Sequence, residues 1–452
     1  MVDSKKNGLS SLGIIEKTYL GILLVIFGGI VLHAPLSVGL GALAPSYELV
    51  FKLWKELLML VAAVAAGLIL YDKRQFKILK EPLMIAIGVY AALHIVLLAI
   101  FWQGLAPSVA GLMIDLRYLF FFVLVYIAVR LYPTSRRLFI KVGVAGALVA
   151  LIFALLQVFI LPVDVLKYIG YSTKTIAPYL TVDQNHNFIR INSTLRGPNP
   201  LGAYVGIVLT LLAAYVIKHR IKKDKWQPVT AGILAFGGVV TLWASYSRSA
   251  LIATFVGVGI VIGATIGRKL SRRTWIIGSV VALALLSGLA LGFGDGYVSN
   301  VLLHENPGQG NSINSNQGHL ESLQDGVKRL GQQPLGGGVG STGSASLYGN
   351  SPLIVENQYL FIAHEAGWAG LVVFVLIFAE VLRQLWRRRQ DYLALGVFAS
   401  GVGLALIGLL LPVWVDDTVA IIWWGLAALA LGSLNVVDGK LPIAPGEVGR
   451  KK

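Results

Sequence analysis

Residues 111–129 read GLMIDLRYLFFFVLVYIAV, an apolar run that only Asp115 and Arg117 interrupt with charge. A run of this length crosses the hydrocarbon core of a bilayer as a single helix. Similar runs recur along the whole chain, which has 452 residues, 56% of them hydrophobic and 13% charged. Because soluble proteins carry about 25% charged residues, the sequence predicts an all-α integral membrane protein.

Hydropathy predicts about twelve transmembrane helices in a single polytopic domain that covers residues 1–452. The predicted spans are 18–35, 51–71, 83–101, 111–130, 139–161, 200–217, 229–246, 249–266, 275–293, 358–382, 393–411 and 418–435. Hydropathy alone also allows the two spans that flank Tyr246–Arg248 to form one long segment. The N-terminal run lacks a small-residue cleavage site, so we expect a retained first helix.

The basic residues predict the orientation of these spans. Of the 38 Lys and Arg residues, 28 fall in segments that share one side of the membrane in this map. Cytoplasmic loops are enriched in Lys and Arg, so we predict cytoplasmic N and C termini and a cytoplasmic tail at 436–452. The net charge of +16 is then mostly a topology signal, and we expect no nucleic-acid partner. Basic residues near the outer segments, Lys55 among them, are interpreted as solvated charges.

Two predicted outer loops are long, the first at 162–199 and the second at 294–357, between the ninth and tenth predicted helices. Loops of such length are usually functional or disordered. The second loop contains a predicted amphipathic helix, HLESLQDGVKRLGQQP at 319–334, followed by the glycine-rich stretch LGGGVGSTGSAS at 335–346.

Charged residues inside or beside the spans are the first candidates for a site. Asp115 and Arg117 lie within a span, where ionisable side chains are expensive and face the bundle interior. They form either a structural pair near the outer helix end or the wall of a polar cavity. Arg196 and Asn199 are assigned to the same wall.

Two further arginines point to an anionic ligand. Arg190 opens RINSTLRGPNPLGAYVG and is either a snorkelling anchor or a ligand-binding residue, whereas Arg248 lies in WASYSRSALIATF. The positive-inside bias disfavours an arginine in so short an outer turn, which favours function at Arg248. Guanidinium groups bind phosphate bidentately and keep their charge. We therefore predict that both arginines bind a pyrophosphate on a lipid carrier.

A general base is the remaining requirement for chemistry at this face. Glu356 ends the long loop just before the tenth span, and a partly desolvated carboxylate near arginines can accept a proton. His319 is the alternative, since it titrates near neutrality, although it can equally be a solvated loop residue. The chain has no cysteine and no Walker, dinucleotide or metal-binding motif. We expect no cofactor and no metal.

Four stretches occur in the same order as in a known family. They are RINSTLRGPNPLGAYVG, SYSRSALIA, QQPLGGGVGSTG and VENQYLFIAHEAGWAGL, at 190–206, 245–253, 332–343 and 355–371. They resemble motifs of the O-antigen ligase and polymerase family of bacterial membrane glycosyltransferases, over roughly residues 110–435. The resemblance implies a GT-C-like helical bundle in the bacterial inner membrane, without a metal, in which arginine supplies the charge stabilisation.

The family also implies substrates. The donor is a glycan on polyprenyl pyrophosphate, and the acceptor is a hydroxyl on a glycan or lipid, with membrane lipids as surroundings. Ligases of the family place a catalytic histidine where this chain has Glu356, while Gly367 and Gly370 keep the spacing that follows. This departure favours a polymerase of lipid-linked repeat units, and the alternative is a ligase that transfers a finished glycan to a lipid or protein. The oligomeric state is not predicted.

A transporter or flippase is the alternative from another class, because twelve spans with both termini inside also suit a transporter. Transporters are expected to have broken or polar helices near the midplane and often an inverted repeat. We find few charged residues deep in the predicted spans and two large outer loops. These features favour an enzyme.

Overall fold

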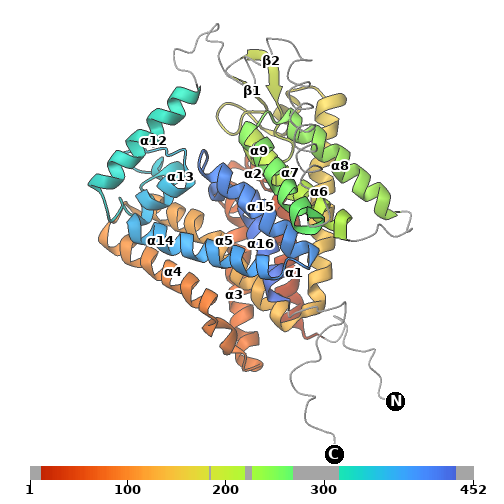
Figure 1. The fold of residues 1–452 in the computed structure, drawn as a ribbon. Coiled ribbons are helices and arrows are strands. Elements are labelled where there is room, and N and C mark those ends of the chain that lie inside the picture. The colour runs from red at the N-terminus through yellow and green to blue at the C-terminus, as the bar shows by residue number, and fades with distance from the viewer. Residues whose placement is uncertain (1–11, 183–184, 219–225, 268–314, 434–452) are drawn as a thin grey trace, which may run out of the picture.

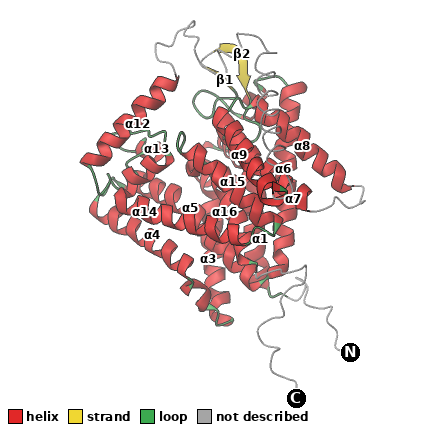
Figure 2. Ribbon diagram, viewed as in Figure 1, coloured by secondary structure: helices red, strands yellow, loops and turns green. Residues whose placement is uncertain are grey.

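The structure is a computed structural model that describes residues 12–182, 185–218, 226–267 and 315–433. The described part is a bundle of helices with one small sheet at its edge (Figures 1 and 2). The helices are α1 (Ile14–Gly29), α2 (His33–Leu43), α3 (Glu48–Asp72), α4 (Pro82–Ile100), α5 (Leu105–Leu131), α6 (Arg136–Phe159), α7 (Pro198–Lys218), α8 (Trp226–Ala244), α9 (Arg248–Thr265), α12 (Ser315–Gln332), α13 (Gly343–Ser346), α14 (Gln358–Arg387), α15 (Tyr392–Gly408) and α16 (Asp417–Gly432).

The long helices agree with the predicted spans. Within the described residues, nine helical segments are long and apolar enough to cross a membrane, and α15 and α16 are shorter apolar helices. Together they account for every predicted span except 275–293, which lies outside the described residues, as do 294–314 and the tail at 436–452. The chain is therefore a multi-pass helical membrane protein.

The turn at Tyr246 separates two helices that hydropathy left joined. Helix α8 ends at Ala244 and α9 begins at Arg248. Tyr246 has a φ of 48°, a left-handed conformation that a continuing right-handed helix does not contain. The prediction of two separate helices here is confirmed.

Segments predicted to share the cytoplasmic side contact one another at one end of the bundle. Ion pairs and hydrogen bonds join Glu16 to Lys73, Glu81 to Arg130, Arg136 to Asp391, and Lys218 to the carbonyl group of Arg389. This grouping agrees with the predicted alternation of the spans. Which side faces the cytoplasm stays a prediction.

The first predicted outer loop contains an antiparallel hairpin that was not predicted from the sequence. Strand β1 (Leu180–Val182) pairs with β2 (Asn185–Arg190), with Leu180 opposite Arg190. The two strands have only three and six residues, LTV and NHNFIR, and together show no sustained alternation of the kind that identifies a half-buried strand. The hairpin brings Arg190 to the point where the chain turns towards α7.

Aromatic packing fixes the central helices α5 and α16 against each other. The ring of Trp424 lies 5.5 Å from that of Tyr118 and 5.8 Å from that of Phe122, and the Trp424 side chain is fully buried. Large rings in such contact contribute beyond their buried area. The same packing places the first residue of α16, Asp417, against the middle of α5.

The second predicted outer loop includes the predicted helix. Helix α12 covers most of 319–334 and packs against α14, where a Cβ atom at Gly326 would lie 2.7 Å from Cδ1 of Leu360. Leu330 is buried, whereas Val327 is 57% exposed, so only a narrow stripe of α12 is covered within the described part. The prediction of a helix here is confirmed.

Candidate functional site

The side chain of Arg190 connects the first outer loop to the turn between α8 and α9. Its Nε donates a hydrogen bond to the carbonyl oxygen of Ser245 at 2.9 Å, and its Nη2 donates to Oδ1 of Asn199 at 2.5 Å. The backbone N–H of Ile191 donates to the carbonyl oxygen of Ala244 at 3.3 Å. The motif that Arg190 opens and the motif that contains Ser245 are therefore in direct contact.

A glycine without a side chain and a serine in a left-handed backbone conformation allow this contact. A Cβ atom at Gly202 would lie 2.8 Å from Cβ of Ala250 and 3.0 Å from Oγ of Ser245, closer than side chains pack. Ser193 has a φ of 50°, and its N–H donates to Oε1 of Gln157 on α6 at 2.8 Å. The loop after Arg190 is thus anchored to α6 while α7 approaches the turn.

Arg248 is the first residue of α9, and its side chain is half-buried. Two residues later, Ala250 lines a small cavity together with Ile407, near the C-terminal end of α15. Because α9 packs along α15, the end of α15 lies beside the turn that carries this arginine.

Glu356 approaches the same end of α15 from another direction. It is exposed and precedes Asn357, whose side chain caps α14 by accepting the N–H of Leu360 at 3.0 Å. A Cβ atom at Gly408, the last residue of α15, would lie 3.4 Å from Cβ of Gln358. The candidate base and the second arginine therefore flank one helix end, although they are far apart in sequence.

His319, the alternative base, lies in α12. The side chains of this helix are described only from Leu323 onward. Helix α12 packs against α14, the helix that begins directly after Glu356 and Asn357.

The glycine-rich stretch wraps around Glu365, a residue to which the sequence analysis gave no role. The Glu365 carboxylate accepts the N–H of Thr342 at 2.7 Å and the N–H of Gly340, and the residue is 1% exposed. Gly336 and Gly338 have φ values of 81° and 93°, which glycine adopts without strain. The sequence offered one indication of this role. Glu365 is a glutamate within a predicted span, and a glycine-rich stretch precedes that span.

Asp115 and Arg117 have separate partners, because side chains two residues apart on a helix do not face each other. The Oδ2 atom of Asp115 lies 3.6 Å from Nε2 of His94 on α4, and both residues are buried. Arg117 forms an ion pair with Asp417 at the start of α16. The structure thus assigns the two residues to different clusters.

Arg117 belongs to a buried group that we call the charge cluster, formed by His33, Lys55, Glu56, Arg117 and Asp417. Lys55 Nζ lies 3.1 Å from Oε1 of Glu56 and 3.1 Å from Oδ2 of Asp417, and His33 Nε2 lies 2.8 Å from the same Asp417 atom. Lys55 is 2% exposed. The interpretation of Lys55 as a solvated charge is therefore wrong, because Glu56 on the same helix and Asp417 on α16 compensate the burial of its charge.

Arg196 is exposed and lies near the start of α16. Removal from water raises the pKa of Asp416, and the charge of Arg196 opposes this rise. Asp416 caps α16 by accepting the N–H of Val419 at 2.9 Å. Arg196 thus places part of the motif that begins at Arg190 near the start of α16, the helix that carries Asp417 of the charge cluster.

The assembled site, made of the Arg190 motif, the turn with Arg248 and the segment with Glu356, offers cationic donors and a carboxylate at one end of the bundle. Within the described ranges, no group of three or more His, Asp or Glu side chains is arranged to hold a metal ion. Arginine side chains are suited to stabilise a charged leaving group. The arrangement suits transfer chemistry with an anionic leaving group.

Comparison with known protein families finds a match to part of the chain. Residues 231–375 match the family model described as O-Antigen ligase. That stretch includes the turn with Arg248, the glycine-rich segment and Glu356, whereas Arg190 and Asp417 lie outside it. No curated protein matches the chain. The match at 231–375 supports membership of the O-antigen ligase/polymerase family and glycan transfer of the O-antigen ligase type.

Proposed function

We propose that this protein polymerises lipid-linked oligosaccharide repeat units at the outer face of the cytoplasmic membrane. The donor is a glycan on polyprenyl pyrophosphate, and the acceptor is a hydroxyl group of another glycan. The observation that carries the proposal is the contact of Arg190 with Ser245 and Asn199. It brings together two arginine-bearing motifs that are separated in sequence.

The reaction follows from the roles of these groups. The acceptor oxygen attacks the anomeric carbon of the donor, and the bond from that carbon to the pyrophosphate oxygen breaks. Glu356 takes the proton of the acceptor hydroxyl, with His319 as the alternative base. Arg190 and Arg248 stabilise the negative charge that collects on the leaving pyrophosphate.

Two features of the described site support these roles of the arginines and Glu356. The arginine-bearing turn and Glu356 flank the same end of α15. Asn357 fixes the start of α14 directly after Glu356, so the backbone that carries the carboxylate is held in place. A site that acts by positioning requires such rigid support.

A ligase is the second candidate, and the description of the matching family model favours it. A ligase would move a finished glycan onto a lipid or protein acceptor. The residue at 356 is the chain's departure from the ligase motif, in which a histidine stands at this place. A carboxylate can act as the base in either reaction, so the product decides between them.

The test compares the glycans of cells with and without the gene. A polymerase predicts that deletion leaves single repeat units on the lipid carrier and that the gene restores long chains. A ligase predicts long chains on the carrier in the deletion strain and none on the final acceptor. Unchanged chain length and unchanged attachment would contradict both enzymes.

A further inference from the structure

The turn between α8 and α9 carries an aromatic ring beside the two arginines of the proposed site. Ser245, whose carbonyl oxygen accepts a hydrogen bond from Arg190, is followed directly by Tyr246, and Arg248 lies two residues further on. Because consecutive Cα atoms are about 3.8 Å apart, the Cα atom of Tyr246 lies less than about 8 Å from that of Arg248. A group bound by both arginines therefore lies near this tyrosine.

A second ring, that of Phe188, reaches the same turn from the hairpin. Phe188 lies in β2, two residues before Arg190, and its ring centroid is 6.3 Å from that of Tyr246, with the ring planes at 76°. The register of the hairpin shifts between Thr181 and Val182, and such irregularities often re-aim a side chain beside an active site. The hairpin thus brings one ring and one guanidinium group to a single turn.

Tyr246 has a backbone conformation that is unfavourable for a tyrosine. Its φ of 48° lies in the left-handed region, which glycine adopts freely and bulky residues rarely adopt. Hydrogen bonds fix the turn, because the N–H of Tyr246 donates to the carbonyl oxygen of Trp243 at 2.9 Å and the N–H of Ser247 donates to Oγ of Ser245 at 3.3 Å. Strain of this kind is concentrated at active sites and ligand clamps. It points to a role for the tyrosine side chain.

The two rings and the two guanidinium groups share one surface. Phe188, Tyr246 and both arginines are partly exposed, whereas Ser245 and Ser247 of the turn are buried. A sugar presents C–H groups on the faces of its ring and hydroxyl groups around its edge. The C–H groups are attracted to the negative face of an aromatic ring, and the hydroxyl groups can accept from arginine. This combination of side chains suits a sugar that carries an anionic group.

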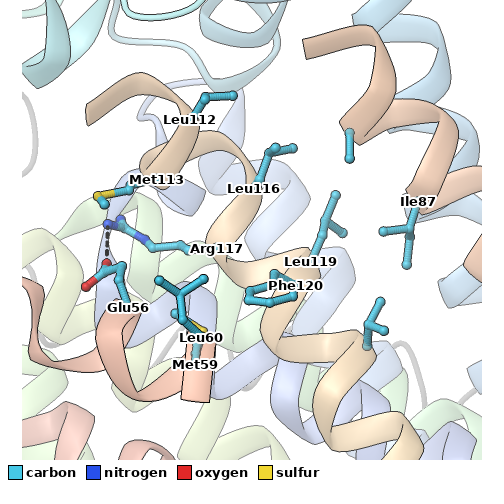
Figure 3. Close-up of a pocket in the computed structure, with 12 residues that line it drawn as sticks. Glu56, Met59, Leu60, Ile87, Leu112, Met113, Leu116, Arg117, Leu119 and Phe120 are labelled. Atoms are coloured by element: carbon cyan, nitrogen blue, oxygen red, sulfur yellow. Dashed lines mark ion pairs between the residues drawn. The ribbon is translucent and has the colours of Figure 1, made fainter. Parts of the chain in front are cut away.

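The cavity between α3, α4 and α5 suits a sugar less well. It has a volume of about 310 Å³ and is lined mostly by apolar side chains, such as those of Leu60, Leu116 and Phe120 (Figure 3). A sugar buried there would leave most of its hydroxyl groups without hydrogen-bond partners, which is costly. The turn between α8 and α9 offers aromatic rings and polar groups together.

The sugar that reacts is bonded directly to the pyrophosphate of the donor. Because the proposed function places that pyrophosphate at the arginines, this sugar has to lie beside them. We propose that the ring of Tyr246 binds this first sugar of the donor through its C–H face, and that Phe188 holds the Tyr246 ring in position. The inference rests on the proposed function and adds a subsite for the sugar to the site for the pyrophosphate.

The first experiment separates the sugar from the pyrophosphate. The purified protein in nanodiscs is titrated with polyprenyl pyrophosphate that carries no sugar and with the lipid-linked saccharide extracted from the deletion strain. Tyr246→Leu removes the ring and should weaken the binding of the saccharide-bearing lipid about tenfold, as one aromatic contact can contribute. It should leave the binding of the sugar-free lipid unchanged. Tyr246→Phe keeps the ring and should bind both lipids as the wild type does.

The control is Tyr168→Leu, the same substitution in the predicted outer loop that contains Phe188. Tyr168 is 73% exposed, and its ring lies 5.1 Å from Nζ of Lys167, so this variant should bind both lipids normally. The sugar contact would be overturned by equal effects of Tyr246→Leu on the two lipids, or by an equal loss in Tyr246→Phe or Tyr168→Leu. Arg248→Ala should weaken the binding of both lipids. Unchanged binding of both by that protein would contradict the pyrophosphate site itself, on which the inference rests.

The second experiment tests whether the ring acts only by holding the turn. Tyr246→Gly also removes the ring but suits the φ of 48°, so its unfolding midpoint should be no lower than that of Tyr246→Leu. Both variants should lose saccharide binding to the same extent. Phe188→Leu should weaken saccharide binding in the wild-type protein and add nothing in the Tyr246→Leu protein, because it acts through Tyr246. Normal binding by Tyr246→Gly, or additive losses for the two rings, would overturn these roles.

Discussion

Lys55 Nζ lies 3.1 Å from Oδ2 of Asp417, and this ion pair joins α3 to the start of α16. The lysine is 2% exposed, and Asp417 also pairs with Arg117 and His33. One carboxylate thus contacts side chains that come from three other helices. The carboxylate of Asp417 is the central group of the charge cluster.

Asp417→Asn is expected to destabilise the protein strongly, because it leaves Lys55 and Arg117 buried with too little negative charge. Breaking a buried ion pair in this way costs about 3–5 kcal/mol. The thermal unfolding midpoint of the purified protein in detergent measures the effect. Glu48→Gln is the control, since its pair with Lys52 is about half exposed and surface pairs contribute little. Equal midpoints for the two variants would contradict this role of Asp417.

Glu365→Ala should loosen the glycine-rich segment of the outer loop. The substitution leaves the N–H groups of Gly340 and Thr342 without their acceptor, at about 1–3 kcal/mol each. Limited trypsin digestion should then cleave faster after Arg329, which lies in the last turn of α12, shortly before this segment. Glu380→Ala provides the control, because its carboxylate pairs with Arg383 on the surface of the same helix. Cleavage at the wild-type rate in the Glu365→Ala protein would show that other contacts hold the loop.

The sequence predicted the helices well because a membrane span is a local property of length and hydropathy. It failed at Lys55, because the partner that allows its burial, Asp417, lies at the far end of the chain. A hydropathy window detects a charge near the end of a span, but it contains no information about a compensating charge on another helix. An ionisable residue inside a span is itself the warning that a partner exists.

The candidate site was predictable in part. Pro and Gly around Arg190 indicated a turn, and the arginine in a short turn indicated Arg248, but the hydrogen bond from Arg190 to Ser245 depends on the packing of three helices. The role of Glu365 was not predictable, since it rests on backbone N–H groups whose direction follows from positive φ angles at glycines. Sequence identifies such glycines but not what they enclose.

The predicted orientation can be tested with single cysteines, because the native chain has none. Lys174 lies in the first outer loop and Lys77 lies between α3 and α4, and both side chains are exposed. An impermeant thiol reagent added to intact cells should label Lys174→Cys and leave Lys77→Cys unlabelled until the membrane is opened. The reverse pattern would invert the map.

Substitution of Arg190 or Arg248 should reduce glycan transfer at equal protein abundance. Alanine is expected to cost roughly 2–4 kcal/mol of transition-state stabilisation, about thirtyfold to nine hundredfold in rate. Lysine keeps the charge but loses the planar fork, so it should restore only part of the rate. Arg383→Ala is the control, since this exposed arginine pairs with Glu380. Normal polymer from the Arg248→Ala protein would remove that residue from the site.

The last prediction concerns the base. Glu356→Gln keeps the size and the hydrogen-bonding capacity of the side chain but cannot accept a proton at neutral pH. It should therefore abolish transfer while the membrane abundance and the binding of the lipid-linked donor stay close to those of the wild type. Donor binding is measured with labelled lipid, and transfer is measured as glycan chain length.

His319→Ala should reduce transfer only mildly if Glu356 is the base. Asn357→Ala separates positioning from proton transfer, because it removes the cap of α14 and leaves the carboxylate in place. It should slow transfer and lower the unfolding midpoint together, whereas Glu356→Gln should affect transfer alone. A fully active Glu356→Gln protein beside an inactive His319→Ala protein would reverse the assignment, and α12 would then carry the base.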